Sequence, residues 1–275
     1  ASTLAIVGMV YLATTALFGT PEFARWAERA DRYAAPETVA RVWADFGMYV
    51  LKIRDGNRTR QPAVIAEGLQ LRLKALDLAR RLGDPDAFWF IAYYIILIPT
   101  LHFTEERWKL AEELASRSRA GVALRTLGIA LLTIGSCFLE SGQRQRASAI
   151  GKELKELAER TRQAHVILLA MEWESFEAVM DGRLEEASAI AQQVPARGEE
   201  LGIPQYASAV ATQSASAYPT LLGDKNEILV RLGRLSQENH FLRAQFLANL
   251  GRNAEVKEIL DRQVITRPGF GTAIA

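Results

Sequence analysis

The sequence predicts an all-α protein, a right-handed superhelical solenoid of about seven antiparallel helical hairpins. The repeat domain is expected to span residues 1–265, with a tail over 266–275. Two kinds of marker recur with one spacing, a glycine that ends an apolar run and a connector with glycine or proline. In addition, no segment shows the sustained alternation of polar and apolar residues that is typical of a half-buried strand.

The single glycines are predicted to form the turns inside hairpins. Each stands where an apolar run ends and a charged run begins, and most neighbours lie about 40 residues apart, as in helical-hairpin repeats. They are Gly19, Gly56, Gly142, Gly182, Gly223 and Gly251. One marker is missing near Leu101 and His102, between Pro99 and Thr104.

The connectors are predicted to join one hairpin to the next, again about 40 residues apart. Glycine permits the left-handed cap of a helix, and proline prevents the helix from continuing. The runs 82–85 and 201–204 share the pattern Leu-Gly-x-Pro, and Ala35-Pro36, Ala120-Gly121 and Arg162-Gln163 stand at other joints.

The first element is an apolar run over residues 2–18. It predicts a buried helix rather than a signal peptide or a membrane span, because no Lys or Arg precedes it and a turn at Gly19-Thr20-Pro21 follows it. The chain begins with Ala, so we expect it to be a piece of a longer polypeptide.

The later elements follow from caps and periodicity. Thr20-Pro21, Gln61-Pro62 and Thr104-Glu105 supply a cap or a first-turn proline for second helices. Between the markers, apolar residues recur every three or four positions. The predicted first helices are 2–18, 37–54, 86–99, 122–140, 164–181, 205–221 and 238–250, and their partners are 21–34, 62–82, 105–119, 144–161, 184–201, 226–235 and 254–264.

Composition narrows the class of partner and the compartment. With 33 basic and 32 acidic side chains, the chain has no net field to attract nucleic acid or an anionic membrane, and we expect neither as a partner. The single cysteine, Cys137, excludes a disulfide within the chain and favours a reducing compartment, the cytoplasm.

Small residues recur where paired helices must approach closely. Gly135 and Phe138 precede Gly142, and Ala147 follows it by five residues; the runs 182–187 and 249–255 have similar spacing. These phrases resemble degenerate tetratricopeptide repeats, although the period of about 40 residues exceeds that family's period of about 34.

The run 73–85 also resembles the longer-period repeats appended to bacterial signal-transduction ATPases, large LuxR-type regulators and some class III nucleotidyl cyclases. The resemblance implies a sensor or assembly arm that binds a protein partner or adjacent domains of the same polypeptide, with a small-molecule effector as an option. A plain tetratricopeptide scaffold for protein assembly is the alternative.

No motif for catalysis is present in the sequence. A phosphate-binding glycine loop is missing, and His102, His165 and His240 lack metal-ligand spacing. Ser136 and Cys137 lie within a helical run, so we interpret them as packing residues. We expect a non-enzymatic protein without metal or cofactor.

A helical-toroid glycosidase is the remaining enzyme hypothesis, because such folds repeat helical hairpins and use an acid and a base. Glu172 and Glu174 are acids beside aromatic residues in an apolar helix. Residues two apart point to different faces of a helix, so this pair is not expected to flank one bond.

The segment 88–98 is apolar all round, which predicts a helix buried on every face. Two interpretations stay open, a central core helix or an inner, concave face that a ligand or partner covers. In the second case the binding residues are Trp89, Tyr93 and Ile96 on one stripe, with Glu172, Phe176 and Gln213 on later first helices.

Overall fold

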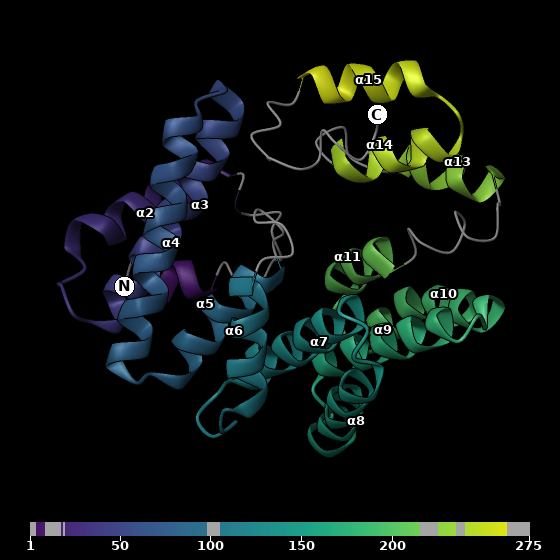
Figure 1. The fold of residues 1–275 in the computed structure, drawn as a ribbon, viewed down its shortest axis with the longest axis horizontal. Helices are drawn as coiled ribbons and strands as arrows, with labels where there is room; N and C mark the ends of the chain where they lie inside the picture. The colour runs from purple at the N-terminus through teal and green to yellow at the C-terminus, as the bar shows by residue number, and fades with distance from the viewer. Residues whose placement is uncertain are drawn as a thin grey trace. The chain divides into compact units, whose positions relative to one another are not determined.

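The computed structural model describes residues 4–8, 18, 20–97, 105–214, 225–234 and 240–262. Their regular structure is helical throughout, which confirms the all-α class (Figure 1). The chain divides into two compact units, Ala1–Val166 and Ile167–Ala275. A single repeat domain over 1–265 stays a prediction, and the tail over 266–275 lies outside the described residues.

The helices follow the predicted order. Residues 4–8 of the first unit are helical. They are followed by α2 (Pro21–Tyr33), α3 (Val39–Thr59), α4 (Pro62–Leu82), α5 (Pro85–Leu97), α6 (Glu105–Ser116), α7 (Leu124–Glu140), α8 (Arg144–Thr161) and the start of α9 (Ala164–Met180). The second unit continues α9 and holds α10 (Leu184–Glu200), α11 (Pro204–Ser214), α13 (Lys225–Arg234), α14 (His240–Asn249) and α15 (Asn253–Arg262). None of these helices is long and apolar enough to cross a bilayer.

The helices from α7 to α11 begin at regular intervals. Their first residues are Leu124, Arg144, Ala164, Leu184 and Pro204, which lie 20 residues apart. Two helices therefore make the period of about 40 residues that the markers predict.

One glycine turn recurs after α7, α9, α10 and α14. At Gly142, Gly182, Gly202 and Gly251, φ lies between 72° and 75°. At each, the glycine amide donates to the carbonyl three residues earlier, and the next amide donates to the carbonyl five residues earlier. This is the Schellman motif, which favours a residue without Cβ. The predicted turns at Gly142, Gly182 and Gly251 are confirmed, and Gly202 shows that the same turn also joins hairpins.

The predicted turn at Gly56 is wrong. Helix α3 continues past it to Thr59, and Arg60 adopts the left-handed conformation, with φ 59° and ψ 42°. Gly56 instead permits close packing, because a Cβ there would lie 2.6 Å from Cγ1 of Ile65 on α4. Gly19 and Gly223 lie outside the described residues.

Aromatic rings form the core of the first unit. The prediction that α5 is buried on every face is confirmed, since each residue from Ala87 to Ile96 is buried. Phe46 of α3 lies among several rings, with centroid distances of 5.1 Å to Phe90 and 4.9 Å to Tyr94 on α5.

Small side chains contribute to the core around α9, α10 and α11 of the second unit, which also buries the large side chain of Trp173. One cluster comprises Ala178, Ala187 and Ala191, and another comprises Leu168, Val194, Ala207 and Val210. The approach between α10 and α11 is so close that a Cβ on Gly198 would lie 2.1 Å from the Cβ of Ala207.

Candidate functional site

The predicted binding residues do not gather in one site within either unit. Trp89, Tyr93 and Ile96 are buried in α5 of the first unit. In the second unit, Glu172 is buried and Phe176 is half-buried on α9. Gln213 lies on α11, but its side chain is outside the described part of the chain. The six-residue site on a concave face stays a prediction.

A surface hollow of about 280 Å³ lies over α5 in the first unit, between α4 and α6, which both pack against α5. We call it the α4–α6 hollow. It is lined by Leu73, Leu76 and Arg80 of α4, Ile95 of α5, and Glu106, Arg107, Lys109, Leu110 and Glu113 of α6. The α4 residues share one helix face because they are three and four residues apart, and the α6 residues mostly follow the same spacing.

The floor of the α4–α6 hollow is apolar and its edge is open. Leu76, Ile95 and Leu110 are buried beneath it. Leu73 remains 43% exposed, although α4 buries the neighbouring positions Arg72 and Ala75. The hollow therefore presents apolar surface to solvent.

One end of the hollow carries a shared ion pair. Arg80 of α4 and Arg117, which follows α6, both contact the Glu113 carboxylate at 2.7 Å. Partial burial raises the pKa of Glu113, but the hydrogen bonds from Arg80 and Arg117 outweigh it and hold that pKa below its ordinary value. Glu113 is thus a carboxylate with two guanidinium partners, which suits a structural anion rather than a general acid.

The other charged groups of the hollow are mostly engaged. Arg107 donates to the Ile96 carbonyl at 2.8 Å and pairs with Glu140 at 2.7 Å. Lys109 pairs with Glu105 at 2.7 Å. Within the described residues, Glu106 is exposed and makes no salt bridge.

A second hollow of about 160 Å³ lies beyond Arg80, where α4 and α6 end. Its floor includes Phe88 and Trp89, so one predicted binding residue does line a hollow. The Arg117 guanidinium lies 4.1 Å from the Phe88 ring centroid, within the range of a cation–π contact.

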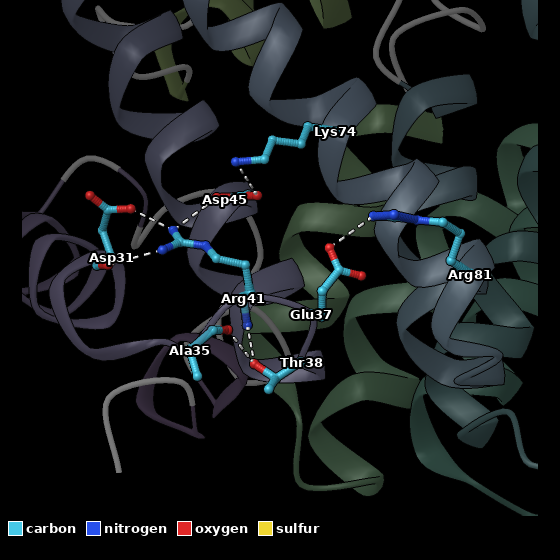
Figure 2. Close-up of polar contacts among 8 residues, drawn as sticks. All are labelled: Asp31, Ala35, Glu37, Thr38, Arg41, Asp45, Lys74 and Arg81. Atoms are coloured by element: carbon cyan, nitrogen blue, oxygen red, sulfur yellow. Dashed lines mark hydrogen bonds and ion pairs between the residues drawn. The ribbon is translucent and has the colours of Figure 1, made fainter.

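A polar cluster around the buried Asp45 joins α2, α3 and α4. Figure 2 shows Arg41 between Asp31 and Asp45, with Lys74 beside Asp45. Asp45 is 1% exposed and lies 2.8 Å from Arg41 and 3.7 Å from Lys74. Burial raises the pKa of Asp45 above its ordinary value, and Arg41 and Lys74 oppose that rise only in part. Because its four charged side chains contact one another, we interpret the cluster as a tether between helices.

Residues singled out for chemistry lie apart from one another. The Ser136 hydroxyl donates to the Leu132 carbonyl and Cys137 is fully buried, consistent with packing roles. Burial lowers the pKa of His165 to about 4, with a further contribution from Arg125, so its imidazole is neutral at pH 7. Among the described residues, no three His, Cys, Asp or Glu side chains are placed to hold a metal ion.

The acids of the glycosidase hypothesis face different surroundings. Glu172 is 4% exposed, whereas Glu174 is exposed on the same helix. This confirms that the pair does not share a face.

Sequence reasoning missed the α4–α6 hollow. Leu73 and Leu76 fit the apolar stripe of a helix, and only the exposure of Leu73 distinguishes it from a core residue. Arg80 and Glu113 are 33 residues apart, and neither charge lies in a motif that would indicate their contact.

Comparison with known proteins gives no match: no family model, no curated protein and no solved structure is similar to this chain.

Proposed function

We propose that this chain is a non-enzymatic interaction arm of a larger bacterial signalling or transcription regulator, and that a protein partner docks in the α4–α6 hollow. The observation that supports this is the apolar floor, open to solvent at Leu73 and bordered by charged side chains. Protein-binding surfaces commonly combine an apolar centre with a polar rim.

The shape of the hollow favours a protein over a small molecule. Small-molecule pockets usually measure roughly 300 to 1,000 Å³ and enclose most of the ligand. At about 280 Å³ the hollow is close to that range, but one wall ends in an exposed leucine, so the hollow does not enclose what it binds. A segment of a protein can cover such an edge, whereas a small ligand would leave it wet.

The proposed mechanism is a shift of populations. We propose that successive hairpins form a right-handed tetratricopeptide-like solenoid in the cytoplasm, where the single cysteine stays reduced. A partner that prefers one spacing of α4 and α6 stabilises that arrangement by no more than its differential affinity. The attached output domain would sense the change through the array.

Selection of helical peptides tests the proposal. A library displayed on phage is selected against the full chain, and binding of the selected peptides is measured by fluorescence anisotropy. We expect Leu73→Arg to weaken binding about tenfold or more, since it places a charge at the apolar edge of the hollow.

The matched control is Leu229→Arg, because Leu229 of α13 in the second unit is similarly exposed, at 48%. This variant should leave binding unchanged. Peptides that bind the Leu73→Arg variant as tightly as the unaltered chain, or an empty selection, would contradict the proposal.

A further inference from the structure

The two ends of the α4–α6 hollow differ, because the helices on its two sides run in the same direction. Arg80 of α4 contacts Glu113 of α6, and the second hollow is lined by the residues that follow the C-terminal ends of both helices. The two helices therefore run the same way along the hollow. One end lies at Leu73 and Glu106, and the other lies at Arg80 and Glu113.

The end at Arg80 carries excess positive charge. Arg80 and Arg117 share one carboxylate, Glu113, and each guanidinium side chain remains 41% exposed. Glu113 accepts hydrogen bonds from Nε and Nη2 of both arginines, so an incoming carboxylate would bind at the remaining Nη1 groups. Bidentate geometry makes guanidinium groups good partners for carboxylates.

The end at Glu106 carries excess negative charge. Lys109 interacts electrostatically with Glu106, but its ammonium group is hydrogen-bonded to Glu105. Arg107 is held by Glu140. Glu106 is thus the acid of the rim that lacks a salt bridge within the described residues, and an incoming cation can supply one.

The two ends are separated by a helical repeat distance. Glu106 and Glu113 lie seven residues apart on α6, which is about 10 Å along the axis at roughly 1.5 Å per residue. Residues seven apart on a docking helix lie on one face with the same separation. A helix also fits the groove between two parallel helix ridges, with its apolar side chains on the floor of Leu76, Ile95 and Leu110.

We propose that the occupant of the α4–α6 hollow is an amphipathic helix of the protein partner with an acidic and a basic residue two turns apart and an apolar residue between them. The acid faces Arg80 and Arg117, and the base faces Glu106. This inference rests on the proposed function, because it names the chemistry of the partner at the same site.

Synthetic peptides test the charge pattern. One helical peptide carries Glu and Lys seven residues apart with Leu between them; a second has Glu in place of that Lys, and a third has Gln at both positions. Binding to the full chain and to its Glu106→Lys variant is measured by fluorescence anisotropy, and circular dichroism checks that the variant is folded.

We expect the Glu–Lys peptide to bind the unaltered chain about two- to fivefold more tightly than the Glu–Glu peptide, the range of an exposed ion pair. In Glu106→Lys the preference should reverse. The Gln peptide lacks both ion pairs, so it should bind each protein less tightly than the better of the two charged peptides and about as tightly as the weaker one.

Three results would overturn the inference. If all three peptides bind equally and lose affinity on Leu73→Arg, the hollow docks proteins without this charge pattern, and the proposed function stands. A preference that persists in Glu106→Lys places the base elsewhere. If the three peptides do not bind while the phage-selected peptides remain Leu73-dependent, the partner has different chemistry.

Discussion

Two helix pairs, one in each unit, bury different kinds of side chain where they meet. In the first unit α3 meets α5 through large rings, and Phe46 packs against both Phe90 and Tyr94. In the second unit α10 meets α11 at Gly198 and Ala207, where a Cβ on Gly198 would lie 2.1 Å from the Cβ of Ala207. Large side chains hold helix axes apart and small ones let them close, within a distance of roughly 8 to 10 Å.

The ion pairs of the two units differ in how far apart their partners lie in the sequence. In the first unit, charged side chains reach from one helix to another, as in Arg80–Glu113 and Arg146–Glu112. In the described part of the second unit the ion pairs join residues at most four positions apart, such as Arg197–Glu200. Both hollows lie in the first unit, and the Arg80–Glu113 ion pair joins two helices that line the α4–α6 hollow.

The largest effect is expected from Phe46→Ala. This change leaves a cavity among the rings of α3 and α5, and we expect a loss of about 3 to 5 kcal/mol in the free energy of unfolding. Denaturant unfolding measures the loss, and hydrogen exchange should show weaker protection in α3 and α5. Equal loss of protection in α10 and α11 would show that the two cores are not independent.

Gly198→Ala is expected to have the next largest effect. Alanine normally stabilises a helix interior by about 1 kcal/mol relative to glycine. Here the new methyl would overlap the Cβ of Ala207, so we expect a loss of about 1 to 3 kcal/mol. The thermal unfolding midpoint reports it.

Two further variants test that contact. Adding Ala207→Gly should restore part of the stability by removing the overlap. Gly233→Ala, on α13 where a Cβ would meet nothing within 4 Å, should not destabilise the protein. If Gly198→Ala is harmless, the close approach of α10 and α11 is not present in solution.

Substitutions at two turn residues should each change the free energy of unfolding by about 1 kcal/mol, with opposite signs. Gly182→Ala places a Cβ at φ 74° and should destabilise the turn after α9. Arg162 adopts the left-handed conformation at the end of α8, with φ 51°, so Arg162→Gly removes the steric cost of a Cβ there and should stabilise the turn. Thermal midpoints measured side by side decide the signs, and shifts in the same direction would contradict the assigned backbone conformations.

The smallest effect is expected from Asp45→Asn, and it should depend on pH. Because burial raises the pKa of Asp45 in the folded state, folding binds its proton more tightly, and the contribution of Asp45 to stability falls as the pH rises above about 3.8. The neighbouring charges Asp31, Arg41 and Lys74 remain in the variant.

The test is the stability of the unaltered chain minus that of Asp45→Asn, measured by urea unfolding from pH 4 to 7. This difference should become less favourable as the pH rises. The lowered pKa of Glu113 acts with the opposite sign, but it is common to both proteins and cancels. A difference that grows with pH would mean that Arg41 and Lys74 outweigh burial.

Local features were predictable from the residues alone. The Schellman turn at Gly142 is closed by hydrogen bonds that span at most five residues, so the glycine and its flanking pattern are enough to place it. The burial of α5 also follows locally, because every face of the segment is apolar.

Contacts between helices were not predictable in this way. Gly56 has the pattern of a turn, yet the side chain of Ile65 across the hairpin explains its presence inside α3. The candidate site depends on such contacts, since Leu73, Ile95 and Leu110 come from three helices.

By itself the sequence determined that this chain is helical, where most described helices begin and end, and which glycines turn the backbone, because those properties depend on hydrogen bonds and caps within a few residues. Only the tertiary structure decided which helices stand apart, which arginines share Glu113, and where apolar surface stays open beside Glu106. Those outcomes depend on side-chain volume and on charges that meet across helices, such as Arg80 and Glu113, which are 33 residues apart, and no local pattern encodes them.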